Sequence, residues 1–109
     1  MVTYDDFTKV ELRSGTVIKA EAFPKAKKPA YKLRVDLGSE IGIKRSSVQI
    51  VKNYKKEDLK GKSCTIFTNL EPRKIKGIES QGMLLAAVNE DESGVKIIQS
   101  DIEPGSKVR

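Results

Sequence analysis

Apolar and charged residues alternate with a period of two in several short runs of this chain, and this alternation restricts the possible folds more than any other feature. From Tyr31 to Leu37, every second residue is apolar and the residues between them are charged. The same pattern runs from Val10 to Ala22, where Gly15 interrupts it and predicts a bulge or a sharp bend. Because side chains alternate between the two faces of a strand, such runs predict strands with one buried face.

The order of the predicted elements favours a small barrel. Strands are expected over residues 10–22, 31–37, 41–50, 62–68, 82–88 and 95–99. The charged run 52–60 ends at Gly61 and predicts one small helix, and Thr3 followed by two aspartates predicts a short N-terminal helix. Five strands with a helix between the third and the fourth are typical of the OB-fold, although strand content alone also permits a sandwich or another barrel. We predict an all-β protein: a five-stranded OB-fold barrel with a short N-terminal helix, one small helix after the third strand and a C-terminal strand extension, formed by residues 1–109 as one domain.

The net charge of +6 is concentrated in the middle of the chain. Residues 23–80 carry fifteen basic and six acidic residues, a net charge of +9, whereas both flanking segments are slightly acidic. A basic centre of this kind favours a polyanionic partner, and a lysine-rich surface without a specific partner is the alternative. Aromatic residues make up only 6% of the chain. This scarcity argues against a base-stacking surface and favours recognition of RNA shape and backbone, or of an extended peptide.

The composition excludes most catalytic and metal-binding chemistry. Histidine is absent, so that imidazole-based triads and metal sites are impossible, and the single Cys64 cannot form an internal disulfide. We expect Cys64 to be a buried, unreactive thiol, and we expect no enzymatic activity, no metal and no other cofactor. No apolar run approaches the ~20 residues that span a membrane, and residues 1–9 lack the pattern of a signal peptide. The expectation is a cytoplasmic protein without membrane insertion.

Four ordered segments resemble the tRNA-binding domain family. They are Phe7-Thr-Lys-Val-Glu-Leu-Arg-Ser-Gly15, Lys28-Pro-Ala-Tyr-Lys-Leu33, Asn69-Leu-Glu-Pro-Arg-Lys-Ile-Lys-Gly77 and Ser80-Gln-Gly-Met-Leu-Leu-Ala-Ala87. A further segment is similar to the CsaA branch of that family, stand-alone dimers described as protein-secretion chaperones: Glu40-Ile-Gly-Ile-Lys-Arg-Ser-Ser-Val-Gln-Ile50. The Ser80 segment, in contrast, keeps the pattern of the tRNA binders.

The resemblance implies a non-catalytic OB-fold homodimer that binds tRNA or structured RNA. The alternative is a CsaA-type export chaperone that binds unfolded or exported polypeptides and works with the secretion machinery. Ten residues are candidates for the RNA site: Lys32, Arg34, Lys44, Arg45, Asn69, Arg73, Lys74, Lys76, Ser80 and Met83.

The alternation places Lys32 and Arg34 on the outer face of the second strand, and Lys44 and Arg45 are expected to continue this basic stripe on the third. A plain solvated face is an equally good interpretation of any one of them. The remaining cations lie in the polar connection 69–81, which forms a wall of the ligand groove in OB-folds. Without the resemblance, that connection is as readily an ordinary solvated loop, and Met83 is better interpreted as a core residue than as part of a ligand rim.

The resemblance also implies pairing through the N-terminal segment and the C-terminal strand region. The apolar residues available for such an interface are Phe7, Ile97, Ile98 and Ile102. A two-fold dimer would place two basic grooves side by side and present both to one RNA.

Overall fold

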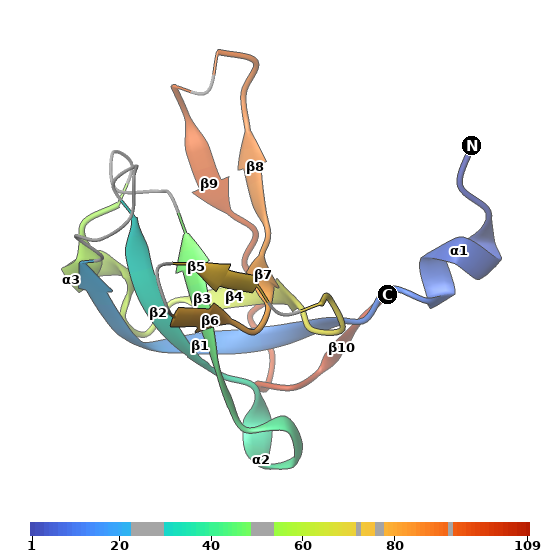
Figure 1. The fold of residues 1–109 in the computed structure, drawn as a ribbon, viewed down its shortest axis with the longest axis horizontal. Coiled ribbons are helices and arrows are strands. Elements are labelled where there is room, and N and C mark those ends of the chain that lie inside the picture. Colours follow the sequence, from blue (N-terminus) through green and yellow to red (C-terminus); the bar gives the residue numbers. More distant parts are fainter. Residues whose placement is uncertain (23–29, 49–53, 72, 76–77, 92) are drawn as a thin grey trace.

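The computed structural model describes residues 1–22, 30–48, 54–71, 73–75, 78–91 and 93–109, without the side chains of 73–75, 78 and 79. Residues 24–29, which connect the first two predicted strands, lie outside the described residues. The described chain consists mostly of strands, and its three short helices all precede β4 (Figure 1). The elements are α1 (Tyr4–Thr8), β1 (Leu12–Ala22), β2 (Tyr31–Asp36), α2 (Gly38–Ile41), β3 (Ile43–Val48), α3 (Lys56–Leu59), β4 (Ser63–Phe67), β5 (Arg73–Ile75), β6 (Ile78–Ser80), β7 (Met83–Leu84), β8 (Ala86–Val88), β9 (Val95–Ile97) and β10 (Lys107–Val108).

Five strands form an antiparallel sheet, in the order β3-β2-β1-β4-β7, that curls into a nearly closed barrel. The short β10 adds a pairing to the start of β1. Residues just before β7 close the barrel against β3: the Gln81 amide donates to the Arg45 carbonyl oxygen at 2.8 Å, and the Ser46 hydroxyl donates to the Gly82 carbonyl oxygen at 3.0 Å. The predicted five-stranded OB-fold barrel, with its N-terminal helix and its helix after the third strand, is confirmed.

The barrel interior is filled by apolar side chains from β1, β2, β4 and the segments beside them. The most deeply buried are Val17, Leu33, Val35, Leu37, Leu59, Cys64 and Ile66. Leu59 anchors the short α3, because burying a leucine contributes about 1.5–3 kcal/mol. Cys64 is buried as predicted, and this burial raises the pKa of its thiol to about 12, which leaves almost no reactive thiolate at neutral pH.

The inward-facing positions of β1 differ from the prediction. Gly15 lies in an unbroken ladder opposite Cys64, and the register shifts later, between Val17 and Lys19. One extra residue therefore reverses the faces of the strand. Val17, which precedes the shift and lies opposite Val35, is buried in the core, whereas Ile18, which the simple alternation would place on the inner face, is the unpaired residue and is only partly buried.

Three segments are divided more finely than expected. The apolar run 82–88 forms two strands, because β7 belongs to the barrel while β8 pairs with β9 in a hairpin that projects from it (Figure 1). Leu85 marks the switch: its amide donates to the Thr65 carbonyl oxygen at 2.9 Å, and its carbonyl oxygen accepts from the Ile98 amide at 3.1 Å. The polar connection 69–81 contains the hairpin β5–β6, and the turn after β2 contains α2.

The C-terminal segment covers part of the outer face of β1 and β4. Ser14 and Thr65 lie opposite each other there, on the side away from the core, yet both are buried. The Ser14 hydroxyl donates to the Glu103 carbonyl oxygen at 2.6 Å, and the Gly105 amide donates to the Ser14 carbonyl oxygen at 2.8 Å. The Thr65 hydroxyl lies 3.4 Å from that of Ser100. Because these polar groups are bonded to the segment above them, they are buried without cost in unsatisfied hydrogen bonds.

The N-terminal arm, as we call residues 1–9 with α1, stands clear of the barrel (Figure 1). Its helix is capped as predicted: the Thr3 hydroxyl accepts the Asp6 amide, and the Asp6 carboxylate accepts the Thr3 amide. None of the helical residues is buried, and both Tyr4 and Phe7 are exposed. The apolar side chains of the arm are therefore free to contact another molecule.

We expect Gly15→Ala to destabilise the barrel. A Cβ atom at this position would lie 2.5 Å from Val35 Cγ1 and 2.9 Å from Leu37 Cδ2, which is closer than carbon atoms pack. Forcing an extra carbon into a packed core costs about 1–3 kcal/mol, which urea unfolding would measure. In the background of Val35→Ala, which removes the nearer contact, the same change should cost less. Strictly additive losses would contradict the packing explanation.

Candidate nucleic-acid interface

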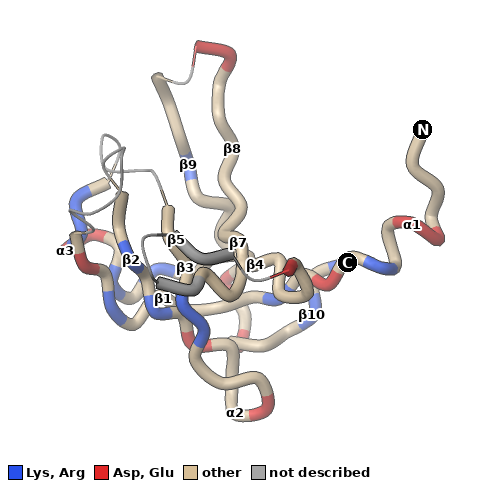
Figure 2. Tube along the Cα trace, in the orientation of Figure 1, with Lys and Arg blue, Asp and Glu red and all other residues tan. Residues whose placement is uncertain are grey.

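The outer face of β1, β2 and β3 carries rows of charged side chains. The register of the two ladders places Lys19, Arg34 and Arg45 opposite one another across the three strands. The next outward-facing row contains Glu21 and Lys32. Figure 2 shows the basic residues of these strands in blue on neighbouring parts of the barrel. Along β2 the residues of these two rows alternate with buried core residues. Both rows therefore lie on the solvent side of the sheet.

One carboxylate lies among these cations. Glu21 pairs with Lys19 at 2.9 Å and with Lys32 at 4.0 Å, and the hydrogen bond from Lys19 together with the nearby positive charges holds the pKa of Glu21 below its ordinary value. Arg34 and Arg45 are exposed and form no ion pair with any described side chain. We call Lys19, Glu21, Lys32, Arg34 and Arg45 the basic face. Four cations and one carboxylate give it a net charge of +3.

The prediction that Lys44 continues the basic stripe with Arg45 is wrong in its geometry. Lys44 lies opposite Val35, whose side chain faces the core. Residues opposite each other in an antiparallel ladder share a face, so that Lys44 leaves β3 on the inner side, where it is half-buried. Only Arg45 extends the stripe of Lys32 and Arg34 onto β3, and an RNA contact from Lys44 stays a prediction.

The hairpin β5–β6 borders the basic face along β3. Its last residue, Ser80, accepts the Ser47 amide at a long 3.4 Å with its hydroxyl oxygen. The side-chain oxygen of Gln81 accepts the Arg45 amide at 3.1 Å. These bonds join the hairpin to the strand that carries the outermost arginine. Ser80 is therefore engaged in closing the barrel at the edge of the predicted site.

The predicted loop cations belong to this hairpin. Arg73 lies opposite Ser80, and Lys74 lies opposite Glu79. Because Ser80 is bonded to β3, the backbone of these two cations lies on the strand next to the one that contacts β3. The side chains of Arg73 and Lys74, and the whole of Lys76, lie outside the described part of the chain. Their contacts with RNA stay predictions.

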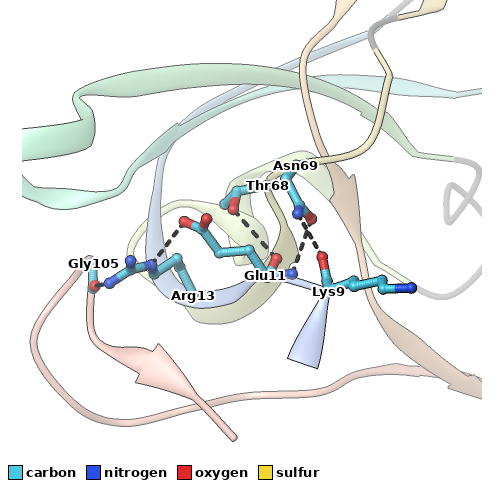
Figure 3. A network of polar contacts seen from close by, with 6 residues as sticks. All are labelled: Lys9, Glu11, Arg13, Thr68, Asn69 and Gly105. Carbon is cyan, nitrogen blue, oxygen red and sulfur yellow. Dashed lines mark hydrogen bonds and ion pairs between the residues drawn. The ribbon is translucent and has the colours of Figure 1, made fainter. Parts of the chain in front are cut away.

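Asn69 is bonded to the backbone at the base of the arm (Figure 3). Its side-chain oxygen accepts the Glu11 amide at 2.9 Å, and its side-chain nitrogen donates to the Lys9 carbonyl oxygen at 2.7 Å. Both the amide and the hydroxyl of Thr68 donate to the Glu11 carbonyl oxygen, at 2.9 and 3.3 Å. Arg13 bonds the Glu11 carboxylate at 3.0 Å. The amide that the resemblance assigns to RNA is thus engaged by the protein's own backbone.

Met83 lies on the outside of the barrel, where it is 45% exposed. It faces Phe67, which faces Leu12, which in turn faces Val108. These four residues form an apolar row across β7, β4, β1 and β10 on the outer surface, since the neighbouring rung of the ladder contains buried core residues. Met83 is therefore not a core residue, and it is available to a ligand or to a partner chain.

Three of the four predicted interface residues are exposed, namely Phe7, Ile98 and Ile102. Ile97 is not available at the surface, because it is only 6% exposed and packs in the core. In Figure 1 the helix α1 stands clear of the barrel, whereas the C-terminus of the chain lies near the base of the arm.

Two residues that the sequence analysis did not select lie at the centre of this site. Lys19 completes the row with Arg34 and Arg45, and Gln81 joins β3 to the hairpin. The alternation of β1 indicates that Lys19 faces outward, but its neighbours follow from the strand register, which one sequence does not specify. Gln81 is uncharged, and nothing in the sequence indicates that it belongs to the site.

The chemistry of the site is that of exposed cations on a rigid sheet. Guanidinium and ammonium groups in such an array bind phosphate or carboxylate groups. Among the described residues, no three acidic, cysteine or histidine side chains gather as a metal site requires. None of the helices in the described chain is long and apolar enough to cross a membrane.

Similar sequences include segments of much longer enzymes. The methionine–tRNA ligase of Thermotoga maritima is 44% identical over 108 residues, which cover 98% of this chain and 16% of the ligase. The methionine–tRNA ligase of Methanocaldococcus jannaschii is 48% identical over 104 residues, which cover 93% of this chain and 15% of the ligase. The chain therefore spans only a small part of the length of these curated relatives.

Three similar solved structures, in contrast, are matched over almost their whole length. The CsaA chaperone protein from Picrophilus torridus matches with a TM-score of 0.93 and 41% identity, and each chain is covered completely. Chaperone CsaA from Bacillus anthracis matches with a TM-score of 0.91 and 38% identity over 100% of this chain and 99% of that one. A MetRS related protein from Pyrococcus horikoshii matches with a TM-score of 0.89 and 34% identity over 100% and 98%.

The family model described as a putative tRNA binding domain matches residues 12–107. This match extends from the first residue of β1 to the first residue of β10, and it includes every strand of the barrel and both hairpins. The chain therefore belongs to the tRNA-binding domain family.

Proposed function

We propose that this protein is a non-catalytic homodimer that binds tRNA or another structured RNA through the basic face and the adjoining hairpin β5–β6. The observation that carries this proposal is the row of Lys19, Arg34 and Arg45 across three neighbouring strands. Arginine binds phosphate oxygens in a bidentate manner, and a row of cations on a rigid sheet can follow a phosphate backbone without changing shape.

The form of RNA that fits this face is structured rather than single-stranded. None of the outward-facing positions in the described parts of β1, β2 and β3 is aromatic. Unpaired bases would find no ring to stack on, whereas the backbone of a folded RNA needs only cations and hydrogen-bond donors. Among the matched proteins, the family description and the names of both ligases concern tRNA, which supports tRNA as the RNA.

The proposed homodimer rests on the exposed arm. The helix α1 buries none of its residues against its own barrel, and Phe7 is 44% exposed. Isolated helices of this length are unstable in water, so that a second barrel is the surface that would hold the arm. The apolar row of Leu12, Phe67, Met83 and Val108 offers such a surface close to the base of the arm.

A second function, binding of unfolded polypeptide, is favoured by two of the solved structures. Both are named CsaA chaperones, and they match this chain over its whole length with TM-scores of 0.93 and 0.91. The projecting hairpin β8–β9 has exposed apolar residues at Val88 and, just after β9, at Ile98. An extended polypeptide can pair with such an edge through main-chain hydrogen bonds.

Removing both arginines of the basic face should weaken tRNA binding. For Arg34→Gln combined with Arg45→Gln, the loss of two phosphate contacts should reduce the slope of log affinity against log salt by about 1.4–1.8. Fluorescence anisotropy over a salt series would measure both affinity and slope. Lys96→Gln combined with Arg109→Gln is the matched control, because it removes the same charge from exposed positions elsewhere. Equal effects of the two variants would show that net charge, and not this face, binds the RNA.

The hairpin variant Arg73→Ala with Lys74→Ala should separate the two functions. If the hairpin contacts RNA, tRNA affinity and its salt slope should both fall, while suppression of a client protein's aggregation should persist because apolar and main-chain contacts carry it. Met83→Ser should have the larger effect on clients. Melting temperature controls for folding. Unchanged tRNA affinity would refute the hairpin as an RNA site and favour the polypeptide function.

Phe7→Asp should dissociate the proposed homodimer. A carboxylate at an apolar contact loses its hydration, at a cost of several kcal/mol, and sedimentation equilibrium would show the shift to monomer. Ile43→Asp is the control, because it places the same charge at an exposed apolar position on the barrel. A wild-type chain that is already monomeric at micromolar concentration would disprove the dimer.

A further inference from the structure

The ladder between β1 and β4 has its last residue pair at Leu12 and Phe67. Beyond this pair, hydrogen bonds between the two segments continue, first through the backbone and then through the Asn69 side chain. The Thr68 amide still donates to the Glu11 carbonyl oxygen, at 2.9 Å. The backbone after Thr68 then leaves the sheet, and the Asn69 side chain takes the place of the next peptide group. It accepts the Glu11 amide at 2.9 Å and donates to the Lys9 carbonyl oxygen at 2.7 Å (Figure 3).

This side-chain bridge lies between the arm and the hairpin β5–β6. Lys9 is the C-terminal residue of the arm and caps α1, whereas Asn69 precedes the first residue of β5 by four positions. Arg13 strengthens the same place by bonding the Glu11 carboxylate and the Gly105 carbonyl oxygen, each at 3.0 Å. The end of the arm, the segment that precedes the hairpin and the C-terminal segment therefore meet in one hydrogen-bonded cluster.

We propose that Asn69 is a positioning residue that couples the arm to the RNA-binding hairpin, and that it does not itself contact RNA. This inference rests on the proposed function. Both polar atoms of its amide already bond to backbone groups, namely the Lys9 carbonyl oxygen at the end of the arm and the Glu11 amide just before β1. The Asn69 side chain ties the end of the arm to the segment that leads into the hairpin, so that the position of each depends on the other. RNA bound to the hairpin would then steady the arm, and an arm held in place would steady the hairpin. The coupling free energy is the same in both directions.

Tryptic release of residues 1–9 from the full chain measures the arm directly. Trypsin cleaves after Lys9, whose side chain is 78% exposed, at the carbonyl group that Asn69 holds. In the absence of RNA, Asn69→Ala should raise the release rate about tenfold, because losing both hydrogen bonds increases local opening. Saturating tRNA should slow release from the wild-type protein. Asn69→Ala should bind tRNA about fivefold or more weakly, the lower end of typical coupling, and should lose this slowing.

Asn89→Ala is the matched control. The Asn89 side chain makes the same pair of bonds within the turn after β8, accepting the Gly94 amide at 2.9 Å and donating to the Ser93 hydroxyl at 3.1 Å. It should lower the melting temperature in a similar way, yet leave arm release and tRNA affinity at their wild-type values. If Asn69→Ala fails to fold, Asn69→Gln replaces it, because that change keeps an uncharged amide but moves its polar atoms away from Glu11 and Lys9.

Three results would overturn the coupling. Weaker tRNA binding by Asn69→Ala with unchanged arm release would make Asn69 a direct RNA contact. Faster release with unchanged affinity would make it an anchor of the arm alone. Equal slowing by tRNA in the variant and the wild type would mean that RNA merely shields Lys9. A wild-type protein that binds neither tRNA nor another structured RNA refutes the proposed function itself, and the binding measurement on the unaltered chain distinguishes that failure from the others.

Discussion

The long strand β1 pairs with three different neighbours, and the rest of the structure depends on how it does so. Its first half pairs with β4 and β10, and its second half pairs with β2. A strand that changes partners in this way must pass close to the core at the point of change. Gly15 lies at that point, where Val35 and Leu37 occupy the space that any Cβ atom would need. The absence of a side chain at this residue thus lets Val35 and Leu37 pack directly against β1.

The register shift after Val17 determines the chemistry of the outer surface. With strict alternation from Val17, Lys19 would point into the core and the row on β2 and β3 would lack its third cation. The extra residue instead turns Lys19 outward opposite Arg34 and turns Ala20 inward opposite Leu33. The same irregularity therefore packs the interior and assembles the basic face. A structural feature of the backbone and a feature of the proposed site have one cause.

The sequence predicts local features of this fold better than contacts between distant segments. Strand β2, the capped helix at Thr3 and the helix before Gly61 follow from alternation and capping, which are properties of neighbouring residues. The burial of Ser14 and Thr65 could not be predicted, because it depends on a C-terminal segment that bonds across them from the far end of the chain. Ile97 was misjudged for the related reason that its hairpin returns it to the core.

The site was predictable to a similar degree. Lys32 and Arg34 lie where the alternation of their strand places them, whereas Lys44 is displaced because it shares the inner face with Val35. Asn69 stands in a segment that resembles a binding signature, and its amide is nevertheless bonded to the arm. A motif marks residues that matter to a fold's function, but it does not distinguish a residue that touches the ligand from one that holds the ligand's surface in place.

The two proposed functions make unequal demands on the outer surface. The basic face occupies β1, β2 and β3, whereas the apolar row occupies β7, β4, β1 and β10. In a homodimer whose arms lie on the apolar rows, both basic faces stay open, so that pairing and RNA binding are compatible and two faces can act on one RNA. Polypeptide bound at Met83 would instead compete with the partner's arm. A client would then be limited to the projecting hairpin near Val88, unless the dimer opened to admit it.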